Sequence, residues 1–539
     1  MTDVLLIQPP IRDFYLTAKR TIPYGLACIA AALMKESFSV EILDGLATSK
    51  SRIIPWPDEM DYLRQYYGKP DTSPFGLFHS FRHFGFSFHH LGEAARQSGA
   101  FLVGIASLFT AYSDEAMKTA EAVKAAHPHC TVVVGGHHAT EMPEEVLQCR
   151  AVDYVLRGEG EVSMPQLARA VREGIHPSCI PGIAYREGDG TIRVQPPAFM
   201  QDLDAYPLPA MSLIRQKFYR RGSSGSTVVM ASRGCPMRCT YCSMGAASSV
   251  PYRRRSVGAV LKEVEEAVVN QGAGFIDFED ENISLQKEWF LKLLKGIQER
   301  CGAYSPELRA MNGLFPPTLD EETIAAMQKA GFKALNLSLG TVAPEQLRRF
   351  QRPDVREAFD RALACAEKTG LEAVGYVIVG APDQDPRDSI GDLLFLASRR
   401  VLAGVSVYYP SPGSSDFRKC HEAQVLPPRL SLMRSTAIPV SHTTTREESV
   451  TLLRLGRILN FMKLQQWNGM NPIEPRPFSE EALRAATDRM ERGVLLLQAF
   501  LHDGIIRGVT PEGEVYAHKT STELCGRFIE GLKKIDQIL

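Results

Sequence analysis

The sequence lacks the features that mark membrane, secreted and nucleic-acid-binding proteins. It contains no run of about 18 apolar residues, so we expect no membrane-spanning helix. Its N-terminus has no basic segment followed by a cleavage site, so we expect no signal peptide. The formal net charge of -1 excludes a broad electrostatic attraction to nucleic acid or anionic lipid. The eleven cysteines are odd in number and most are scattered, which indicates a reducing cytoplasm rather than a disulfide framework.

One loop nevertheless concentrates three cysteines at C-x3-C-x2-C spacing, namely Cys235, Cys239 and Cys242, directly after the apolar segment 227–231. Three thiolates at this spacing can hold three corners of a 4Fe–4S cluster and leave the fourth iron without a protein ligand. The alternative is a structural zinc site, which normally has four ligands, often in paired C-x-x-C elements. The sequence has no such partner pair, so the spacing favours the cluster.

The chain of 539 residues is long enough for two to four domains. In its first part, apolar strands alternate with helices, which indicates a doubly wound parallel sheet. Ligands of such sheets bind beyond the carboxyl ends of the strands. No G-x-G-x-x-G follows the first strand, so the dinucleotide fingerprint is absent. The expected strands are 4–8, 40–44, 101–107, 131–136 and 152–158, and their polar or glycine-rich ends are 107–113, 135–140 and 158–161.

The second part of the chain predicts a partial (β/α)6 barrel with a mainly helical C-terminal region. Its strands are expected at 227–231, 275–278, 335–340, 373–382 and 405–414, with a helix at 256–270. Beyond the barrel we expect helices at 447–463 and 480–501, the second capped by Ser479, and a hairpin at 508–518. The expected division is 1–165 for the sheet domain, 166–225 for a connector with a hairpin, 226–420 for the barrel and 421–539 for the C-terminal region.

The cysteine spacing is the signature of the radical SAM superfamily, and here Tyr241 precedes its last cysteine. The segments 23–33, 133–140 and 152–161 resemble the cobalamin-binding domain of class B radical SAM enzymes, and the resemblance covers roughly 1–420. It implies an α/β fold with a Rossmann-like cobalamin-binding domain, and as cofactors a 4Fe–4S cluster, S-adenosyl-L-methionine (SAM) and cobalamin. The motif D-x-H-x-x-G, which supplies a histidine beneath cobalt in many cobalamin proteins, is absent. The resemblance therefore implies base-off cobalamin.

The resemblance also implies the residues of the two sites. His137 and His138 would lie near the nucleotide tail of cobalamin, although either could equally be a turn histidine. Relatives often have a glutamate two residues beyond Gly340, where this chain has Val342. The expected cobalamin-binding residues are Ser107, Thr110, Tyr112, Gly135, Gly136, His137, Gly158, Glu159 and Gly160. The expected SAM-binding residues are Tyr241, Glu279, Asp280, Glu281, Ser338, Gly340, Gly375 and Gly380.

The resemblance implies a methyltransferase that uses a 5′-deoxyadenosyl radical to remove a hydrogen atom from an unactivated carbon, and then transfers a methyl group from methylcobalamin. Two alternatives stay open. One is an enzyme with the same cofactors that cyclises or rearranges its substrate without methyl transfer, and the other is a sensor that binds cobalamin and an iron–sulfur cluster. The implied partners are an electron donor such as flavodoxin or ferredoxin and a small-molecule substrate, for example a lipid, a tetrapyrrole or a natural-product intermediate.

Two further segments carry expectations. The aromatic and histidine-rich stretch 50–98 is interpreted as an insertion that packs over the sheet edge, with a metal site at its histidines as the alternative. The helices of 421–539 are expected to pack in a core, and we hypothesise that they also close the barrel mouth. In that case, deletion beyond about residue 440 would abolish substrate turnover and leave SAM cleavage measurable.

Overall fold

The computed structural model describes residues 2–15, 21–245, 250–433, 440, 442–469 and 473–535. Its N-terminal part is a seven-stranded sheet of order β10-β9-β8-β7-β6-β1-β3. The five strands from β3 to β8 in this order are parallel, as the apolar segments predicted. They are β1 (Val4–Gln8), β3 (Val40–Asp44), β6 (Leu102–Ala106), β7 (Thr131–Gly135) and β8 (Tyr154–Leu156).

Helices cover both faces of this sheet because its strands are apolar on both sides. Helix α1 (Tyr24–Lys35) and helix α7 (Gly160–Glu173) pack on one face, around Leu6 and Val133. Helix α3 (Phe88–Ser98) and helix α4 (Ser113–Ala126) pack on the other, around Val103 and Val134. The hairpin of β9 (Ile183–Arg186) and β10 (Ile192–Val194) pairs antiparallel with β8, so it extends this sheet.

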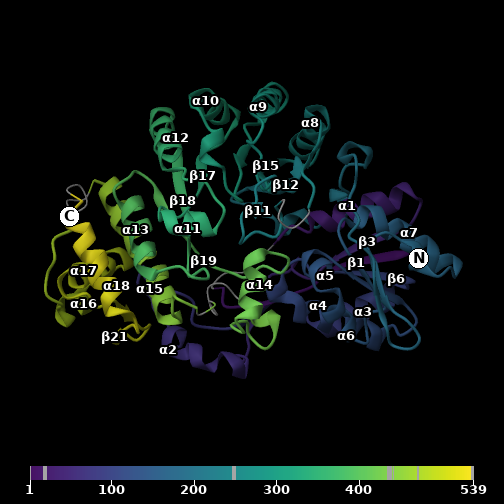
Figure 1. Ribbon diagram of the computed structural model, residues 1–539, viewed down its shortest axis with the longest axis horizontal. Helices are drawn as coiled ribbons and strands as arrows, with labels where there is room; N and C mark the ends of the chain where they lie inside the picture. Colours follow the sequence, from purple (N-terminus) through teal and green to yellow (C-terminus); the bar gives the residue numbers. More distant parts are fainter. Residues whose placement is uncertain are drawn as a thin grey trace.

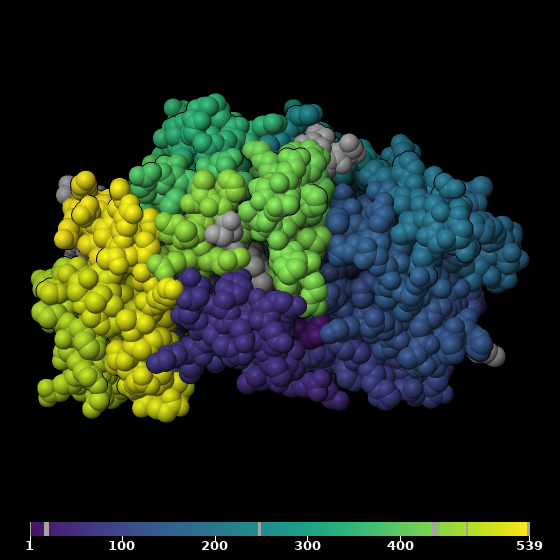
Figure 2. Space-filling view, turned by 60° about the horizontal axis from the view of Figure 1, so that its bottom comes forward, coloured from purple at the N-terminus to yellow at the C-terminus, as the bar shows by residue number. Residues whose placement is uncertain are grey.

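The aromatic stretch supplies β4 (Ser51–Ile53) and β5 (Arg82–Phe84), which form a small sheet with β2 (Ile11–Asp13). Between β4 and β5 the chain forms η1 (Asp58–Leu63) and α2 (Arg64–Tyr67). This stretch reaches past the sheet domain to the other end of the molecule, as Figure 2 shows in purple beside the yellow C-terminal helices. Phe14, Trp56 and Tyr67 share a core with Leu432 and Val450. The expectation of a cover over the sheet edge is therefore wrong, because these aromatic side chains find their apolar partners in the C-terminal region.

The metal alternative for this stretch also fails within the described residues, where no three His, Cys, Asp or Glu side chains are placed to hold one metal ion. The ring of His83 instead bonds to the carbonyl of Phe86, and the ring of His90 stacks on that of Phe86.

Six parallel strands form the partial barrel, with helices on its outer side (Figure 1). An isolated parallel bridge between Leu314 and Leu337 joins its two sheets. The strands are β12 (Ser224–Val229), β15 (Ala273–Phe278), β16 (Glu307–Arg309), β17 (Ala334–Gly340), β18 (Glu372–Val379) and β19 (Leu402–Val407). The outer helices are α8 (Val257–Glu265), α9 (Lys287–Cys301), α10 (Glu321–Ala330), α12 (Arg356–Thr369) and α13 (Pro386–Ala397).

The C-terminal helices continue the hydrophobic core of the barrel. Helix α15 (Arg446–Trp467) runs along β19, and its Leu452 and Leu455 lie in the same core as Val377 and Leu396. The side chain of Asn460 bonds to both the N–H and the carbonyl of Ala403 on β19. The described helices therefore lie beside the barrel (Figure 1), and the closure of its mouth by the C-terminal region stays a prediction.

The expected single helix at 480–501 is two helices, α16 (Glu480–Ala485) and α17 (Arg489–Asp503). Ser479 caps the first, as predicted, and Asp488 caps the second by accepting bonds from the N–H groups of Met490 and Glu491. A side chain that caps a helix ends any continuous helix through its position. The chain then forms the hairpin β20 (Arg507–Val509) and β21 (Val515–Ala517) and ends in α18 (Thr522–Leu532). No helix in the described part of the chain is long and apolar enough to cross a membrane.

Candidate active site

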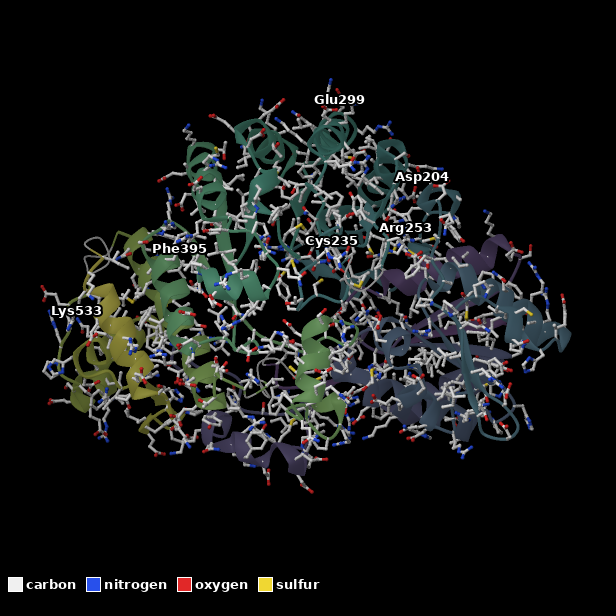
Figure 3. All side chains as sticks on the ribbon, in the orientation of Figure 1. Asp204, Cys235, Arg253, Glu299, Phe395 and Lys533 are labelled. Atoms are coloured by element: carbon white, nitrogen blue, oxygen red, sulfur yellow. The ribbon has the colours of Figure 1, made fainter. Side chains whose placement is uncertain are left out.

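The three cysteines lie on a loop between two short strands at the carboxyl end of β12. Strand β13 (Ser232–Arg233) precedes the loop, and β14 (Arg253–Arg254) follows it and pairs with β13. Cys235 and Cys239 are only 8% and 5% exposed, and Cys242 is half-buried. The N–H of Cys242 donates to the carbonyl of Cys239 at 3.2 Å. Figure 3 shows Cys235 near the centre of the molecule, where the barrel strands end.

The chemistry of this loop fits a 4Fe–4S cluster. Burial raises the pKa of Cys235 and raises that of Cys242 to about 11, and in both cases the neighbouring Cys239 raises it further. Thiolates this close repel one another, so the loop needs a cation to hold them, and iron in a cluster is such a cation.

Thr240 anchors the loop to two other parts of the barrel. Its N–H donates to the carbonyl of Phe350 at 3.1 Å, and its hydroxyl donates to Asp416 at 3.1 Å. Asp416 lies in the first turn of α14 (Ser415–Glu422), and its own N–H donates to the carbonyl of Thr240. The position between Cys239 and Tyr241 is therefore fixed from both sides.

Arg352 connects the cysteine loop to strand β17, and the sequence analysis did not identify it. The Nη1 of Arg352 lies 4.0 Å from the Sγ of Cys239 and donates to the Tyr241 hydroxyl at 3.1 Å. Its Nη2 donates to both the carbonyl and the hydroxyl of Ser338, at 2.6 and 2.9 Å. Its buried Nε has no partner in the structure. The stem of Arg352 fills the space beside Gly340, where a Cβ would lie 3.2 Å from Nε.

Of the three acidic residues after β15, Asp280 has a structural role in the protein. The carboxylate of Asp280 accepts from the N–H of Ala231 at 3.1 Å and from the Ser232 hydroxyl at 2.5 Å, so it holds the start of the cysteine loop. Burial raises its pKa to about 6. Glu279 lies beside Asp277, and burial followed by this like charge raises its pKa.

Glu281 has a buried carboxylate oxygen that is available for a ligand. Its Oε2 is buried without a partner, and burial raises its pKa to about 7. The negative charge of Glu281 also raises the pKa of Cys235 and of Cys242, so Glu281 lies near the cysteine loop. A carboxylate so placed is suited to accept hydrogen bonds from the ammonium group of SAM.

The structure requires glycine for different reasons at the three glycine positions expected in the SAM site. Gly340 and Gly380 have φ angles of +82° and +75°, so both turns need glycine. Gly375 instead allows close packing on the outer side of the barrel, where a Cβ would lie 2.7 Å from Leu396 and 2.8 Å from Phe359. A SAM contact from Gly375 would therefore come from its backbone.

At the carboxyl ends of β6 and β7, the structure brings most of the expected cobalamin-binding residues together. Gly136 has a φ of +113°, and a Cβ there would lie 2.7 Å from the carbonyl of Ser107. A Cβ on Gly135 would meet only the carbonyl of Leu156, at 3.6 Å, so the space beside this residue is open. The hydroxyl of Ser107 is buried without a partner. Thr110 lies in the same group and bonds to His138 at 3.2 Å.

Two exposed apolar side chains complete this surface, and the sequence analysis missed them. Leu108 and Phe109 are 49% and 50% exposed, directly after Ser107. Exposed apolar residues beside an orphan hydroxyl and an open glycine backbone fit the flat, amide-rimmed ring of a corrin. The Leu-Phe pair at a predicted strand end was the signal that could have found them.

The remaining expected cobalamin residues are held by protein contacts. The hydroxyl of Tyr112 donates to Asp13 at 2.6 Å. Gly158 has a φ of +83°, and Gly160 begins α7, where a Cβ would lie 2.6 Å from Ile29. The carboxylate of Glu159 pairs with Arg233 on β13 and Arg253 on β14, the two strands that flank the cysteine loop. A cobalamin contact from Glu159 would therefore come from its backbone.

Those arginines join the two domains. Arg253 donates to both oxygens of Glu159 at 2.8 and 2.9 Å, and Arg233 pairs with Glu159 at 3.3 Å and with Glu161 at 2.6 Å. These four side chains are at most 19% exposed. In Figure 3, Arg253 lies on the side of Cys235 that faces the N-terminal domain.

A second connection is direct. The Nε2 of His137, in the first turn after β7, lies 3.0 Å from the hydroxyl of Ser243, the residue after Cys242. Ser243 also bonds to the hydroxyl of Ser411 beyond β19, at 2.8 Å. The ring of His137, which was expected near the nucleotide tail of cobalamin, contacts the cysteine loop. The glycine-rich surface and the cysteine loop are therefore neighbours across one interface.

Comparison with known proteins assigns both halves of this arrangement. The model of the radical SAM superfamily matches residues 229–396, and the model of the B12 binding domain matches residues 82–168. This chain is a cobalamin-dependent radical SAM enzyme. The cofactors of this radical SAM enzyme are a 4Fe–4S cluster, SAM and cobalamin, as the cysteine spacing and the strand-end segments predicted.

Three relatives match most of the radical SAM enzyme. An uncharacterized methyltransferase of Pyrococcus horikoshii is 26% identical over 76% of this chain and 81% of its own length. The cytidylyl-2-hydroxyethylphosphonate methyltransferase of Streptomyces wedmorensis is 24% identical over 80% of this chain and 84% of its own length. The solved structure of the radical S-adenosylmethionine methyltransferase TsrM from Kitasatospora setae has a TM-score of 0.57 at 20% identity, with 78% of this chain and 76% of that chain covered, so it shows the fold.

Proposed function

We propose that this enzyme transfers a methyl group to an unactivated carbon of a small molecule. The observation that carries the proposal is the contact between His137 and Ser243, because it brings the surface suited to a corrin next to the loop that holds the cluster. When bound, the cluster supplies the electron that cleaves SAM into a hydrogen-abstracting radical, and the cobalamin supplies the methyl group. Two relatives that match more than three-quarters of this chain are named as methyltransferases.

The residues of this chain would bind, orient and shield these groups. Cys235, Cys239 and Cys242 would each hold one iron. Glu281 would accept the ammonium group of SAM, and Arg352, through its unpartnered Nε, would donate to the SAM carboxylate. The ion pairs of Glu159 and Glu161 would keep the cobalamin surface in register with the cysteine loop. Proton transfer by side chains is not needed in the radical step, so the site requires no general base.

Three parts of the proposal concern the surroundings of the enzyme. A flavodoxin or ferredoxin would deliver the electron to the cluster. The cytoplasm, where thiols stay reduced, would be the location of the enzyme. Cyclisation or rearrangement with the same cofactors is the competing reaction, because it uses the same residues.

The decisive experiment is anaerobic reconstitution of the enzyme with cobalamin, iron and sulfide, followed by addition of a low-potential reductant such as dithionite and of SAM that carries a 13C-labelled methyl group. The enzyme is then incubated with extracts of cells that lack it, and the products are identified by mass spectrometry. A product heavier than its precursor by one labelled CH2 supports methyl transfer. Substrate consumption with 5′-deoxyadenosine formation and no labelled product would establish the competing reaction.

Matched variants define the contribution of the cluster. Alanine at Cys235, Cys239 or Cys242 should remove the iron–sulfur absorbance and all SAM cleavage. The control is Cys420→Ala, because Cys420 is a buried cysteine of α14 outside the loop. SAM cleavage that persists in a loop variant contradicts the assignment of the cluster.

A further inference from the structure

The interior of the partial barrel is accessible to solvent and carries polar side chains. Along β18 the buried residues Val377 and Val379 face the outer helices, whereas Tyr376 and Ile378 face inward and are only half-buried. Met311, just beyond β16, is 48% exposed. The ring of Tyr376 lies over Gly404 of β19, where a Cβ would be only 2.5 Å from it. The aromatic ring therefore stands across the barrel interior and can be reached by a ligand.

Four polar side chains from four neighbouring strands meet at this level. Arg309 on β16 donates through Nε and Nη2 to one carboxylate oxygen of Asp277 on β15, at 3.0 and 2.5 Å. The hydroxyl of Tyr376 donates to the Oδ1 of Asn336 on β17 at 3.2 Å. The charges of Arg309 and Asp277 both act on Tyr376, so the two pairs are close to each other.

The donors left over in this group are the Nδ2 of Asn336 and the Nη1 of Arg309, which makes neither of the two bonds to Asp277. Both oxygens of Asp277 are used, because the second accepts from the N–H of Met311 at 3.3 Å. The Nδ2 of Asn336 is buried without a partner, and the residue is only 6% exposed. An unpaired buried amide donor is costly to stability, so such a group marks a place where a ligand supplies the acceptor.

We propose that the Nδ2 of Asn336 and the free Nη1 face of Arg309 bind an oxyanionic group of the substrate, a carboxylate or a phosphate, while the ring of Tyr376 packs against the substrate beside it. This inference rests on the proposed function, because it names the substrate class of the same site. It replaces a purely hydrocarbon lipid among the expected substrates with molecules that carry an acid group. The SAM molecule also carries a carboxylate, so SAM is the second source of the same chemistry.

The first experiment needs no substrate. Binding of inorganic phosphate and of acetate to the cofactor-loaded enzyme is measured by calorimetry, with chloride at matched ionic strength as the reference. The variant Asn336→Asp keeps the side-chain shape and can still accept from Tyr376, but it places a negative charge where the oxyanion would bind. We expect the dissociation constant to rise about tenfold or more. The control is Asn468→Asp at the exposed end of α15.

The same titration separates the two sources of the carboxylate. It is repeated with saturating SAM while the cluster is kept oxidised, so that SAM is not consumed. Phosphate binding that is equal with and without SAM supports a substrate site. Binding that disappears when SAM is added, or a dissociation constant that is equal in the wild type and in Asn336→Asp, overturns the proposal. Should Asn336→Asp fail to fold, Asn336→Leu removes the donor without adding charge and is read in the same way.

A second experiment tests the substrate class directly. An extract of cells that lack the enzyme is passed over an anion exchanger, and each fraction is tested for its ability to raise 5′-deoxyadenosine formation above the rate without extract. We expect the retained, anionic fraction to do so, and we expect Asn336→Asp to lose this stimulation while the control Asn468→Asp keeps it. Stimulation by the unretained fraction overturns the proposal. Stimulation without a 13C-methyl product contradicts methyl transfer and leaves the anion site standing.

Discussion

The guanidinium of Arg352 lies 4.0 Å from the Sγ of Cys239 and is held there by Ser338 and Tyr241. A fixed positive charge beside a cluster ligand stabilises the reduced, more negative cluster. Arg352 thus belongs both to the cysteine loop and to the barrel strand that carries Ser338.

Removal of that charge should make the cluster harder to reduce. We expect Arg352→Gln to lower the reduction potential by roughly 60 mV, which for one electron corresponds to about 1.4 kcal/mol. The potential is measured by a redox titration followed by electron paramagnetic resonance. Arg352→Lys should keep most of the effect, and Arg348→Gln, on the exposed face of the preceding helix, should change nothing. An unchanged potential in Arg352→Gln contradicts the role.

The open space beside Gly135 should be required for cobalamin. Gly135→Val places a side chain in that space, where its Cβ would meet only the Leu156 carbonyl, at 3.6 Å. We expect the variant to fold with its cluster intact and to bind cobalamin at least about tenfold more weakly, as measured by the absorbance of bound cobalamin. Gly188→Ala, in an open hairpin turn, is the control. Normal cobalamin binding by Gly135→Val would place the corrin elsewhere.

Asp392 should make the stability of the enzyme depend on pH. It is fully buried on α13, where it accepts from the Thr341 hydroxyl and the Val342 N–H, and burial raises its pKa to about 8. The folded protein therefore binds a proton that the unfolded chain has released. This contribution to stability is complete below the unfolded pKa near 4 and is lost as the pH rises toward 8.

Between pH 5 and 8, Asp392 alone should lower the free energy of unfolding by about 1 kcal/mol per pH unit. Asp392→Asn should remove this slope, and denaturant unfolding at several pH values measures it. The exposed Asp354→Asn is the comparison, because Asp354 pairs only at the surface with Arg356. Equal slopes in the wild type and in Asp392→Asn would mean that Asp392 is ionised throughout.

Deletion of the residues beyond 440 should destroy the barrel. The sequence alone predicted that SAM cleavage would survive this deletion, but Leu452, Leu497 and Phe500 lie in the same core as the barrel residues Val377 and Leu396. The truncated chain should be unfolded by circular dichroism and hold no iron. The milder variant Leu497→Ala should lose about 2–5 kcal/mol of stability. A folded truncated protein that cleaves SAM would restore the earlier expectation.

The sequence predicted those parts of the site that depend on neighbouring residues. The spacing of Cys235, Cys239 and Cys242 sets their positions on one loop, and the apolar runs set the strands whose ends carry Gly135 and Gly136. Strands β1 and β3 begin and end where the apolar pattern indicated. Local patterns of this kind are readable because their partners lie a few residues away in the chain.

The residues that sequence reasoning missed act through distant partners. Arg352 reaches Cys239 across 113 residues of chain, and Glu159 reaches Arg253 across 94. In the sequence, Asn336 has no feature that distinguishes it from other strand residues. Its role depends on Tyr376 and Arg309, which only the fold brings near it. The destination of the aromatic insertion depends on Leu432 and Val450, which no local pattern relates to it.

The two bonds between Asn460 and Ala403 affect more than the position of α15. A barrel that does not close leaves a terminal strand whose backbone groups could pair with a strand of another chain, and such pairing leads to aggregation. The amide of Asn460 offers one donor and one acceptor, as the backbone of a further strand would. The Asn460 side chain thus makes the two hydrogen bonds that a further strand would make to Ala403. The barrel can therefore stay open at β19 without leaving these backbone groups free to pair with another chain.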